Sequence, residues 1–282
     1  MSRHVPRTGV RRYVNAVNIG GLVIAVCATL PLIWMASASL KGPGEISATP
    51  PSLLPSHPTL GNYGTAFSRN GIGHYFLNSV VVACCSTVLI LSLAFFAGYA
   101  LARLPLRGRG AIMTALLMLS VFPPIALLVP LFLMERQAEL LNSYPGLIIP
   151  YVALNLPFAI WIMRNYLSGI PRELEEAAAI DGAGPLRTAV KVILPLARPG
   201  MFTAGVFSFT ATWSEFLLAL TFNGSDDRRT VSVGIALFTS QYQVPYGVIF
   251  AGAMVATVPI AVLVLIFRRS VVSGMTTGAV KG

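Results

Sequence analysis

Residues 76–100 read FLNSVVVACCSTVLILSLAFFAGYA, a run without Lys, Arg, Asp, Glu or His. A bilayer core about 30 Å thick is crossed by about 20 apolar residues in a helix. The run is continuously apolar and lacks the alternation of a barrel strand, so it predicts a membrane helix. Across the 282 residues 55% are hydrophobic and only 11% charged, whereas soluble domains carry about a quarter charged residues. A soluble enzyme and a disordered chain are therefore excluded.

Five further stretches meet the same requirement, which predicts an all-α integral membrane protein with six transmembrane helices. The predicted spans are Val17–Ala38, Phe76–Ala100, Ala111–Leu133, Pro145–Leu167, Met201–Phe222 and Val248–Phe267. The first is too long for the apolar part of a signal peptide, about 7–15 residues, and is interpreted as a retained span. The predicted organisation is an N-terminal tail (1–16), a transmembrane domain (17–267) that contains a polar loop (168–199), and a C-terminal tail (268–282).

Basic residues indicate the orientation of these spans. With the N-terminus in the cytoplasm, 15 of the 20 Lys and Arg residues fall in cytoplasmic loops and tails. This bias follows the positive-inside rule and predicts a multi-pass inner-membrane protein with both termini cytoplasmic. It also accounts for the net charge of +10 without a nucleic-acid partner.

The three cysteines, Cys27, Cys84 and Cys85, all lie in apolar runs without paired spacing. They predict buried thiols rather than a disulfide framework or a zinc site. The three histidines are scattered through the N-terminal tail and the first outside loop. No metal site is expected.

The most informative polar stretch runs from Ser168 to Pro195. Pro171 suits a first helical turn, three glutamates follow it where the helix dipole favours acids, and Gly182 suits a helix C-terminus. Pro185 then begins a second helix, which Pro195 closes. The pattern predicts a cytoplasmic helix-turn-helix.

Ala177, Ala178 and Ala179 give the first of these helices a smooth flank that another backbone can approach closely, and its carboxylates can pair with Arg or Lys of a partner. The alternative is an amphipathic helix on the membrane surface. Such a helix carries basic residues and large apolar anchors, whereas this one carries four acids against Arg172. The pattern favours a protein-docking helix.

The spacing Glu176-Ala177-Ala178, three residues, Gly182, nine residues, then Val-Ile-Leu194-Pro195 resembles the EAA signature of ATP-binding-cassette importer permeases. Val192 replaces the family's first Ile. The ending, from Arg268 to Gly282, resembles the tail of MalG-type carbohydrate permeases, with Met275 where Leu is frequent. The resemblance extends over essentially the whole chain and implies the type I importer permease fold.

The resemblance also implies partners and site residues. A dimer of nucleotide-binding subunits would receive the EAA helix and hold ATP and Mg. A second permease would complete a heterodimer, and an extracytoplasmic solute-binding protein would contact the loop Asn223–Gly247. The residues implied in ATPase coupling are Glu176, Ala177, Ala178, Asp181, Gly182, Leu194 and Pro195, and those implied in a tail contact with the ATPase are Gly274, Thr276, Gly278 and Lys281.

No G-x-x-x-x-G-K-[ST] sequence occurs, so this chain is expected to bind no nucleotide, to have no catalytic residues and to depend on a separate ATPase. Glu215, a candidate for the solute path, lies in a predicted span, where an ionisable group either faces a cavity or a helix partner or reaches water at the span end. Asn155 and Trp213, with Trp34 and Trp161, are candidates for lining a solute path, although Trp in spans is more often packing or interfacial.

Two of the loops expected outside the membrane are 41–75 and Asn223–Gly247, and the second is either a partner contact or a short re-entrant or surface helix. The function predicted from these features is import of a sugar or sugar derivative. An importer of another solute is the nearest alternative. A secondary transporter leaves the docking helix unexplained, and an intramembrane enzyme lacks a convergent pair of reactive groups.

Overall fold

The computed structural model describes the backbone of residues 8–238 and 244–279 and the side chains of residues 18–238 and 244–267. Across these ranges the chain forms helices and no β-strand, which confirms the predicted all-α class. Four helices are long and apolar enough to cross a membrane. They are α1 (Thr8–Ser39), α4 (Ile72–Arg103), α7 (Tyr144–Ser168) and α14 (Tyr246–Ala279).

Two further apolar runs are bent pairs of helices. Helices α5 (Arg109–Val121) and α6 (Pro124–Gln137) meet at 90°, and the run Pro185–Leu196 meets α11 (Arg198–Trp213) at 76°. If each pair is one crossing, the described chain has up to six crossings.

Two predicted spans are not continuous helices. The span 111–133 breaks at Pro123 and Pro124, because a residue before proline is driven to extended backbone, and Phe122 and Pro123 both adopt it. The span 201–222 stops at Trp213 and resumes as α12 (Leu217–Phe222). The apolar composition of both runs was correctly identified, whereas the break after Trp213 was not predicted.

The chain divides into two compact units. In the larger one, residues 71–237 with 256–282, α4 packs along α7 through small residues. Ala94, Gly98 and Ala102 repeat every four residues, the spacing of one helix face, and a Cβ on Gly98 would lie 2.9 Å from the Cβ of Met163. Small residues allow such close approach where lipid offers no hydrophobic drive for association.

Contacts within this unit show in which direction its helices run. The Tyr144 hydroxyl, at the start of α7, donates to the Asn78 side chain near the start of α4, so α4 and α7 are parallel. Gly200, at the start of α11, packs against Tyr166 near the end of α7, so α11 runs the opposite way.

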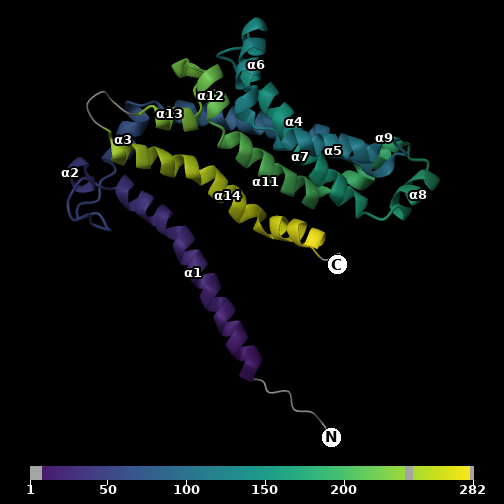
Figure 1. Cartoon of the computed structure of the whole chain (residues 1–282), viewed down its shortest axis with the longest axis horizontal. Coiled ribbons are helices and arrows are strands. Elements are labelled where there is room, and N and C mark those ends of the chain that lie inside the picture. The colour runs from purple at the N-terminus through teal and green to yellow at the C-terminus, as the bar shows by residue number, and fades with distance from the viewer. Residues whose placement is uncertain (1–7, 239–243, 280–282) are drawn as a thin grey trace. The chain divides into compact units, whose positions relative to one another are not determined.

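The two ends of α4 carry different structures. At the Ile72 end, Asn78 donates to the carbonyls of Asp227 (3.1 Å) and Arg229 (2.8 Å), and Ser79 accepts from the Val231 N–H (2.8 Å). Helices α12 and α13 (Val231–Ala236) lie at this end, whereas α8 (Glu173–Ile180) and α9 (Pro185–Thr188) lie at the other (Figure 1). Thirty-two residues make α4 about 48 Å long, enough to separate the two faces of a membrane.

The smaller unit comprises residues 1–70 and 238–255. The Asn62 amide of α3 (Gly61–Ser68) donates to the carbonyls of Ser39 and Lys41, each at 2.8 Å. Lys41 is buried, with Nζ 4.5 Å from the centre of the Trp34 ring and donating to the Ser52 carbonyl. These bonds tie the end of α1 to the loop that follows it.

A second anchor in this loop is Glu45, in α2 (Pro43–Ile46). Its carboxylate accepts from the Ser56 N–H (2.5 Å) and the Ser52 hydroxyl (3.3 Å). The Ser56 N–H, more than any other cause, lowers the pKa of Glu45 below its ordinary value. The loop is therefore ordered by specific polar contacts.

The cysteine prediction was correct about the absence of pairing and wrong about burial. Cys27, Cys84 and Cys85 are unpaired, but all three are exposed on the surface of the chain rather than buried. Cys27 lies in α1, where every residue from Asn18 to Trp34 is exposed, and Cys84 and Cys85 lie on α4 near the exposed Val88 and Leu89. Apolar residues point outward here because the surroundings of a membrane helix are themselves apolar.

Candidate functional site

The polar loop forms the predicted helix-turn-helix. Helix α8 ends in a glycine cap: the Gly182 N–H donates to the Ala179 carbonyl (3.0 Å), and the Ala183 N–H donates to the Ala178 carbonyl (2.9 Å). Gly182 has φ +76°, a conformation that glycine adopts without a Cβ penalty. The turn thus fixes the angle between α8 and α9.

The second half of the motif is not a regular α-helix. After α9, residues Ala189–Ile193 form a π-helical turn that leads into α10 (Leu194–Leu196). Pro195 has no N–H to continue the regular helical hydrogen-bond pattern. The Leu194 N–H donates to the Ala189 carbonyl, five residues earlier. Ile193 is buried, Leu194 half-buried and Pro195 exposed. The predicted residues Leu194 and Pro195 therefore sit at the joint that leads into α11.

Helix α8 presents most of its predicted docking residues to the outside. Glu176, Ala177, Asp181 and Gly182 are exposed, whereas Ala178 is buried. The buried side of α8 faces its own chain, and the exposed side is free to meet a partner.

The structure adds two apolar residues that the sequence analysis missed. Ile180 is 87% exposed and Leu186 is 68% exposed, close to the exposed acids Glu176 and Asp181. Ile180 follows Glu176 by four residues and shares its helix face. The sequence signal was the pair of large apolar residues on either side of the turn from Gly182 to Pro185.

The predicted tail residues lie at the end of α14. Gly274, Thr276 and Gly278 belong to its helical backbone, so the predicted tail continues the last helix through Ala279. Their side chains and Lys281 lie outside the described residues.

Glu215 lies at the break between α11 and α12. Its carboxylate accepts from the N–H groups of Leu218 (2.8 Å) and Ala219 (3.1 Å) and from the Tyr151 hydroxyl (2.5 Å). The side chain caps α12 and ties it to α7. Asn155 donates to the Tyr151 carbonyl one turn earlier in α7 (2.8 Å), so these polar groups lie close together.

Trp213 is buried among other aromatic rings. It stacks on Phe209 (5.5 Å between ring centres), meets Phe76 edge-on (5.4 Å), and donates its indole N–H to the Ala256 carbonyl (3.1 Å). Because the side chain is only 3% exposed, its surroundings are those of a packing residue.

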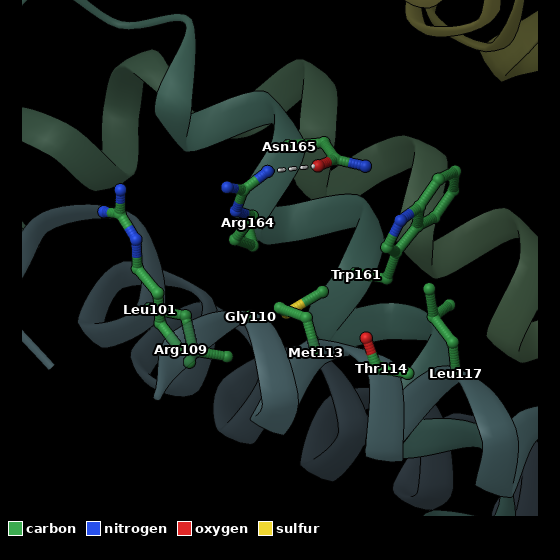
Figure 2. A pocket seen from close by; sticks show the side chains of 9 residues that line it. All are labelled: Leu101, Arg109, Gly110, Met113, Thr114, Leu117, Trp161, Arg164 and Asn165. Atoms are coloured by element: carbon green, nitrogen blue, oxygen red, sulfur yellow. Dashed lines mark hydrogen bonds between the residues drawn. The ribbon is translucent and has the colours of Figure 1, made fainter. Parts of the chain in front are cut away.

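A cavity of about 230 Å³ lies between α5 and α7 (Figure 2). It is lined by Leu101, Arg109, Gly110, Met113, Thr114, Leu117, Trp161, Arg164 and Asn165. Arg164 donates to the Asn165 side-chain oxygen (3.0 Å), and Figure 2 shows Trp161 beside this pair. Of the path candidates Asn155, Trp213, Glu215, Trp34 and Trp161, only Trp161 lines this cavity.

At the other end of the larger unit, residues 223–230 are held by hydrogen bonds. The Asn223 amide donates to the Ser143 and Arg228 carbonyls, and the Ser225 N–H donates to the Asn142 side chain (2.9 Å). His74 contacts the Asp227 carbonyl. The segment therefore holds a defined shape with the Asp226 and Asp227 side chains largely exposed.

These features define an all-helical membrane protein with an exposed helix-turn-helix at one end and an ordered loop at the other. The chain belongs to the family of binding-protein-dependent transport system inner membrane components, whose family model matches residues 90–276.

Relatives cover nearly the whole chain. It is 42% identical to the sulfoquinovosyl glycerol transport system permease protein SmoH of Agrobacterium fabrum, over 94% of this chain and 93% of that protein. It is 41% identical to the trehalose transport system permease protein SugB of Mycobacterium tuberculosis, over 97% and 100%. The trehalose/maltose transport system permease protein MalG of Thermococcus litoralis is 36% identical, over 94% and 95%.

Solved structures share the fold. A chain of a bacterial ABC transporter involved in the import of the acidic polysaccharide alginate matches with a TM-score of 0.79 and 23% identity, over 95% of this chain and 99% of that chain. A chain of the MetNI methionine ABC transporter in inward-facing conformations matches with a TM-score of 0.51 and 19% identity, over 72% and 94%.

Proposed function

We propose that this chain is a permease subunit of an ATP-binding-cassette importer that moves a sugar or sugar derivative across the inner membrane. The observation that carries the proposal is the exposed, glycine-capped helix α8 at one end of the larger unit, with Glu176, Ala177 and Gly182 on its surface. Sugars are the solutes named for the relatives SugB and MalG, which supports the substrate class.

The proposed topology has six crossings with both termini in the cytoplasm. Helices α4 and α7 are parallel, so the chain between them must return from the Arg103 end to the Ile72 end. Helices α5 and α6 together make this return crossing, despite the 90° bend between them. Helix α14 runs opposite to α11, because Ala256 meets Trp213 and Phe267 stacks on Phe202. Its C-terminal end therefore lies on the side of α8.

The energy for transport comes from a separate ATPase dimer that holds ATP and Mg. A cleft in each ATPase subunit receives α8, with Ala177 in close contact and Glu176 paired with a basic residue. Leu194 and Pro195 pass the motion to α11. The end of the chain, with Gly274, Thr276, Gly278 and Lys281, reaches the ATPase interface. Nucleotide binding and hydrolysis then alternate the permease between two states.

The extracytoplasmic partner is a solute-binding protein that docks on residues 223–230. Hydrogen bonds with His74, Asn78 and Asn142 hold this loop in place and support the assignment, because a pre-ordered loop binds at a lower entropic cost. Asp226 and Asp227 are exposed but pair with Arg229 and Arg228, so this loop presents charges of both signs to the partner.

A second, different permease subunit completes the pathway. The described side chains of α5 include no buried residue, and Met118, Leu119 and Val121 are strongly exposed. Such a face suits contact with lipid or with another membrane helix, and we assign it to the second permease. Trp161 and Asn165 then line the solute path with an apolar ring and an amide, groups suited to a sugar. Asn155 and Glu215, which Tyr151 brings close together at the α11–α12 break, remain candidates for the path, with Glu215 acting first as the cap of α12.

The decisive experiment is co-purification of the chain from detergent, identification of the co-purifying subunits, and reconstitution of the complex in vesicles with its binding protein. We expect uptake of a sugar, tested with a panel that includes trehalose and sulfoquinovosyl glycerol, only when ATP is present. Glu176→Lys and Gly182→Pro should abolish uptake and leave membrane insertion intact. Normal uptake in both variants would contradict the docking assignment. ATP-driven uptake confined to amino acids or inorganic ions would favour the alternative, an importer for another solute.

A further inference from the structure

A partly buried ion pair joins α8 to the end of α4. Arg103, the last residue of α4, places Nε 2.7 Å from a carboxylate oxygen of Glu175, and its side chain is only 5% exposed. The same guanidinium donates to the Ile170 carbonyl (2.7 Å). The Tyr99 hydroxyl, one turn earlier in α4, donates to the other Glu175 oxygen (3.3 Å). We call Tyr99, Arg103, Ile170 and Glu175 the α4–α8 latch.

The latch and the docking surface lie on different sides of α8. Successive residues of a helix point about 100° apart, so Glu175 faces α4 while the neighbouring Glu176 is exposed. A partner that binds Glu176 and Ile180 therefore leaves the latch intact. The two acids have separate roles although they are adjacent in the sequence.

Without the latch, α8 would be joined to the membrane helices through compliant segments. The linker before it, residues 169–172, follows the end of α7 at Ser168, and beyond the fixed turn at Gly182 the chain passes through the π-helical turn Ala189–Ile193. Motion of α8 would be absorbed by rotation in these segments. Arg103 instead fixes both α8 and its preceding linker to α4, which packs along α7 and α11.

We propose that Arg103 is a positioning residue that makes α8 and α4 move as one body, so that motion of the ATPase reaches the central helix of the larger unit directly. This inference rests on the proposed function, and it adds a second mechanical route beside the covalent one through α10 and α11. Removal of one charge from a partly buried pair leaves the other uncompensated, so the latch is sensitive to single substitutions.

The test uses the complete reconstituted complex and measures solute transported per ATP hydrolysed. Arg103→Ala should lower this ratio about tenfold while hydrolysis stays within about twofold of the unmodified complex. The charge-swapped double variant, Arg103→Glu with Glu175→Arg, should recover at least a third of the ratio measured for the unmodified complex. Arg107→Gln, which removes an exposed positive charge from the same end of α4, is the control and should change nothing.

Equal loss of hydrolysis and uptake, through failure of the complex to assemble, would overturn the proposal and leave the pair as a folding contact. An unchanged ratio in Arg103→Ala would also overturn it. If the unmodified complex shows no ATP-driven uptake, the proposed function fails instead.

A second measurement tests the latch independently of transport. Spin labels at Leu104→Cys and Ala179→Cys, in a chain with the three native cysteines replaced by Ser, report the distance between the end of α4 and α8. We expect a narrow distribution that broadens at least twofold in Arg103→Ala and stays narrow in Arg107→Gln. The same width in all three chains would show that Arg103 does not position α8.

Discussion

The Glu215 carboxylate pairs with backbone N–H groups at the start of α12 that have no carbonyl partner in a preceding helical turn. It accepts from two N–H groups at the start of α12 and from Tyr151 of α7. Free N–H groups at a helix start require such acceptors, above all where water is absent. The side chain therefore makes the break between α11 and α12 possible.

We predict that Glu215→Ala lowers the free energy of unfolding by about 1–2 kcal/mol, the usual cost of a lost helix cap. Glu215→Gln should lie between Ala and the unmodified chain, because the amide keeps one acceptor oxygen. Denaturant unfolding in detergent measures both. Normal stability combined with weaker uptake would instead favour a role in the solute path.

Trp213 and Trp161 differ in surroundings although both were candidates for the path. Trp213→Ala removes a buried ring and should cost about 3–5 kcal/mol of stability, seen as a lower unfolding midpoint. Trp161→Ala, at a cavity wall, should lower the free energy of unfolding by no more than about 1 kcal/mol. It should raise the solute concentration needed for half-maximal uptake. A stable Trp213→Ala chain with altered solute preference would place Trp213 in the path.

At the scale of elements, the angle of the helix-turn-helix depends on one backbone conformation. Gly182 has φ +76° and open space around it, so substitutions there act through the backbone alone. We predict a cost of about 1–2 kcal/mol for Ala, less for Asn, which tolerates this region, and most for Val. ATP-driven uptake should fall in the order Asn, Ala, Val. Equal activity of all three would show that the turn angle is unimportant.

The packing of α4 on α7 depends on the absence of a side chain at Gly98. A Cβ there would lie 3.0 Å from the Arg164 backbone nitrogen, which cannot move independently. We predict that Gly98→Val destabilises the chain by at least about 2 kcal/mol through overpacking. Gly110→Ala is the control, since no atom lies within 4 Å of its added Cβ, and it should leave the unfolding midpoint unchanged or higher. Similar midpoints for both variants would contradict the close crossing.

At the scale of the whole molecule, the sidedness of the membrane is tested by cysteine labelling. In a chain without native cysteines, Asp227→Cys should react with an impermeant maleimide added to intact cells with a permeable outer membrane. Gly184→Cys should react only in lysed cells or inverted vesicles. Labelling of both from the same side would refute the proposed six crossings.

The sequence alone was sufficient to predict an all-helical membrane protein and to locate its polar helix-turn-helix. Both depend on local physics: apolar runs long enough for a bilayer, and proline, acids and glycine at helix ends. Gly182 was correctly placed at a helix end because the left-handed conformation is a property of a single residue.

The tertiary structure decided which residues meet. Whether Pro123 and Pro124 only bend a span or turn it by 90° depends on the neighbours that satisfy the freed backbone. The contact of Arg103 with Glu175 joins residues that are far apart in the sequence, and no local pattern distinguishes Glu175 from Glu176. Likewise, Trp213 and Trp161 both lie in apolar runs, and only the packing of the helices makes one a core residue and the other a cavity wall.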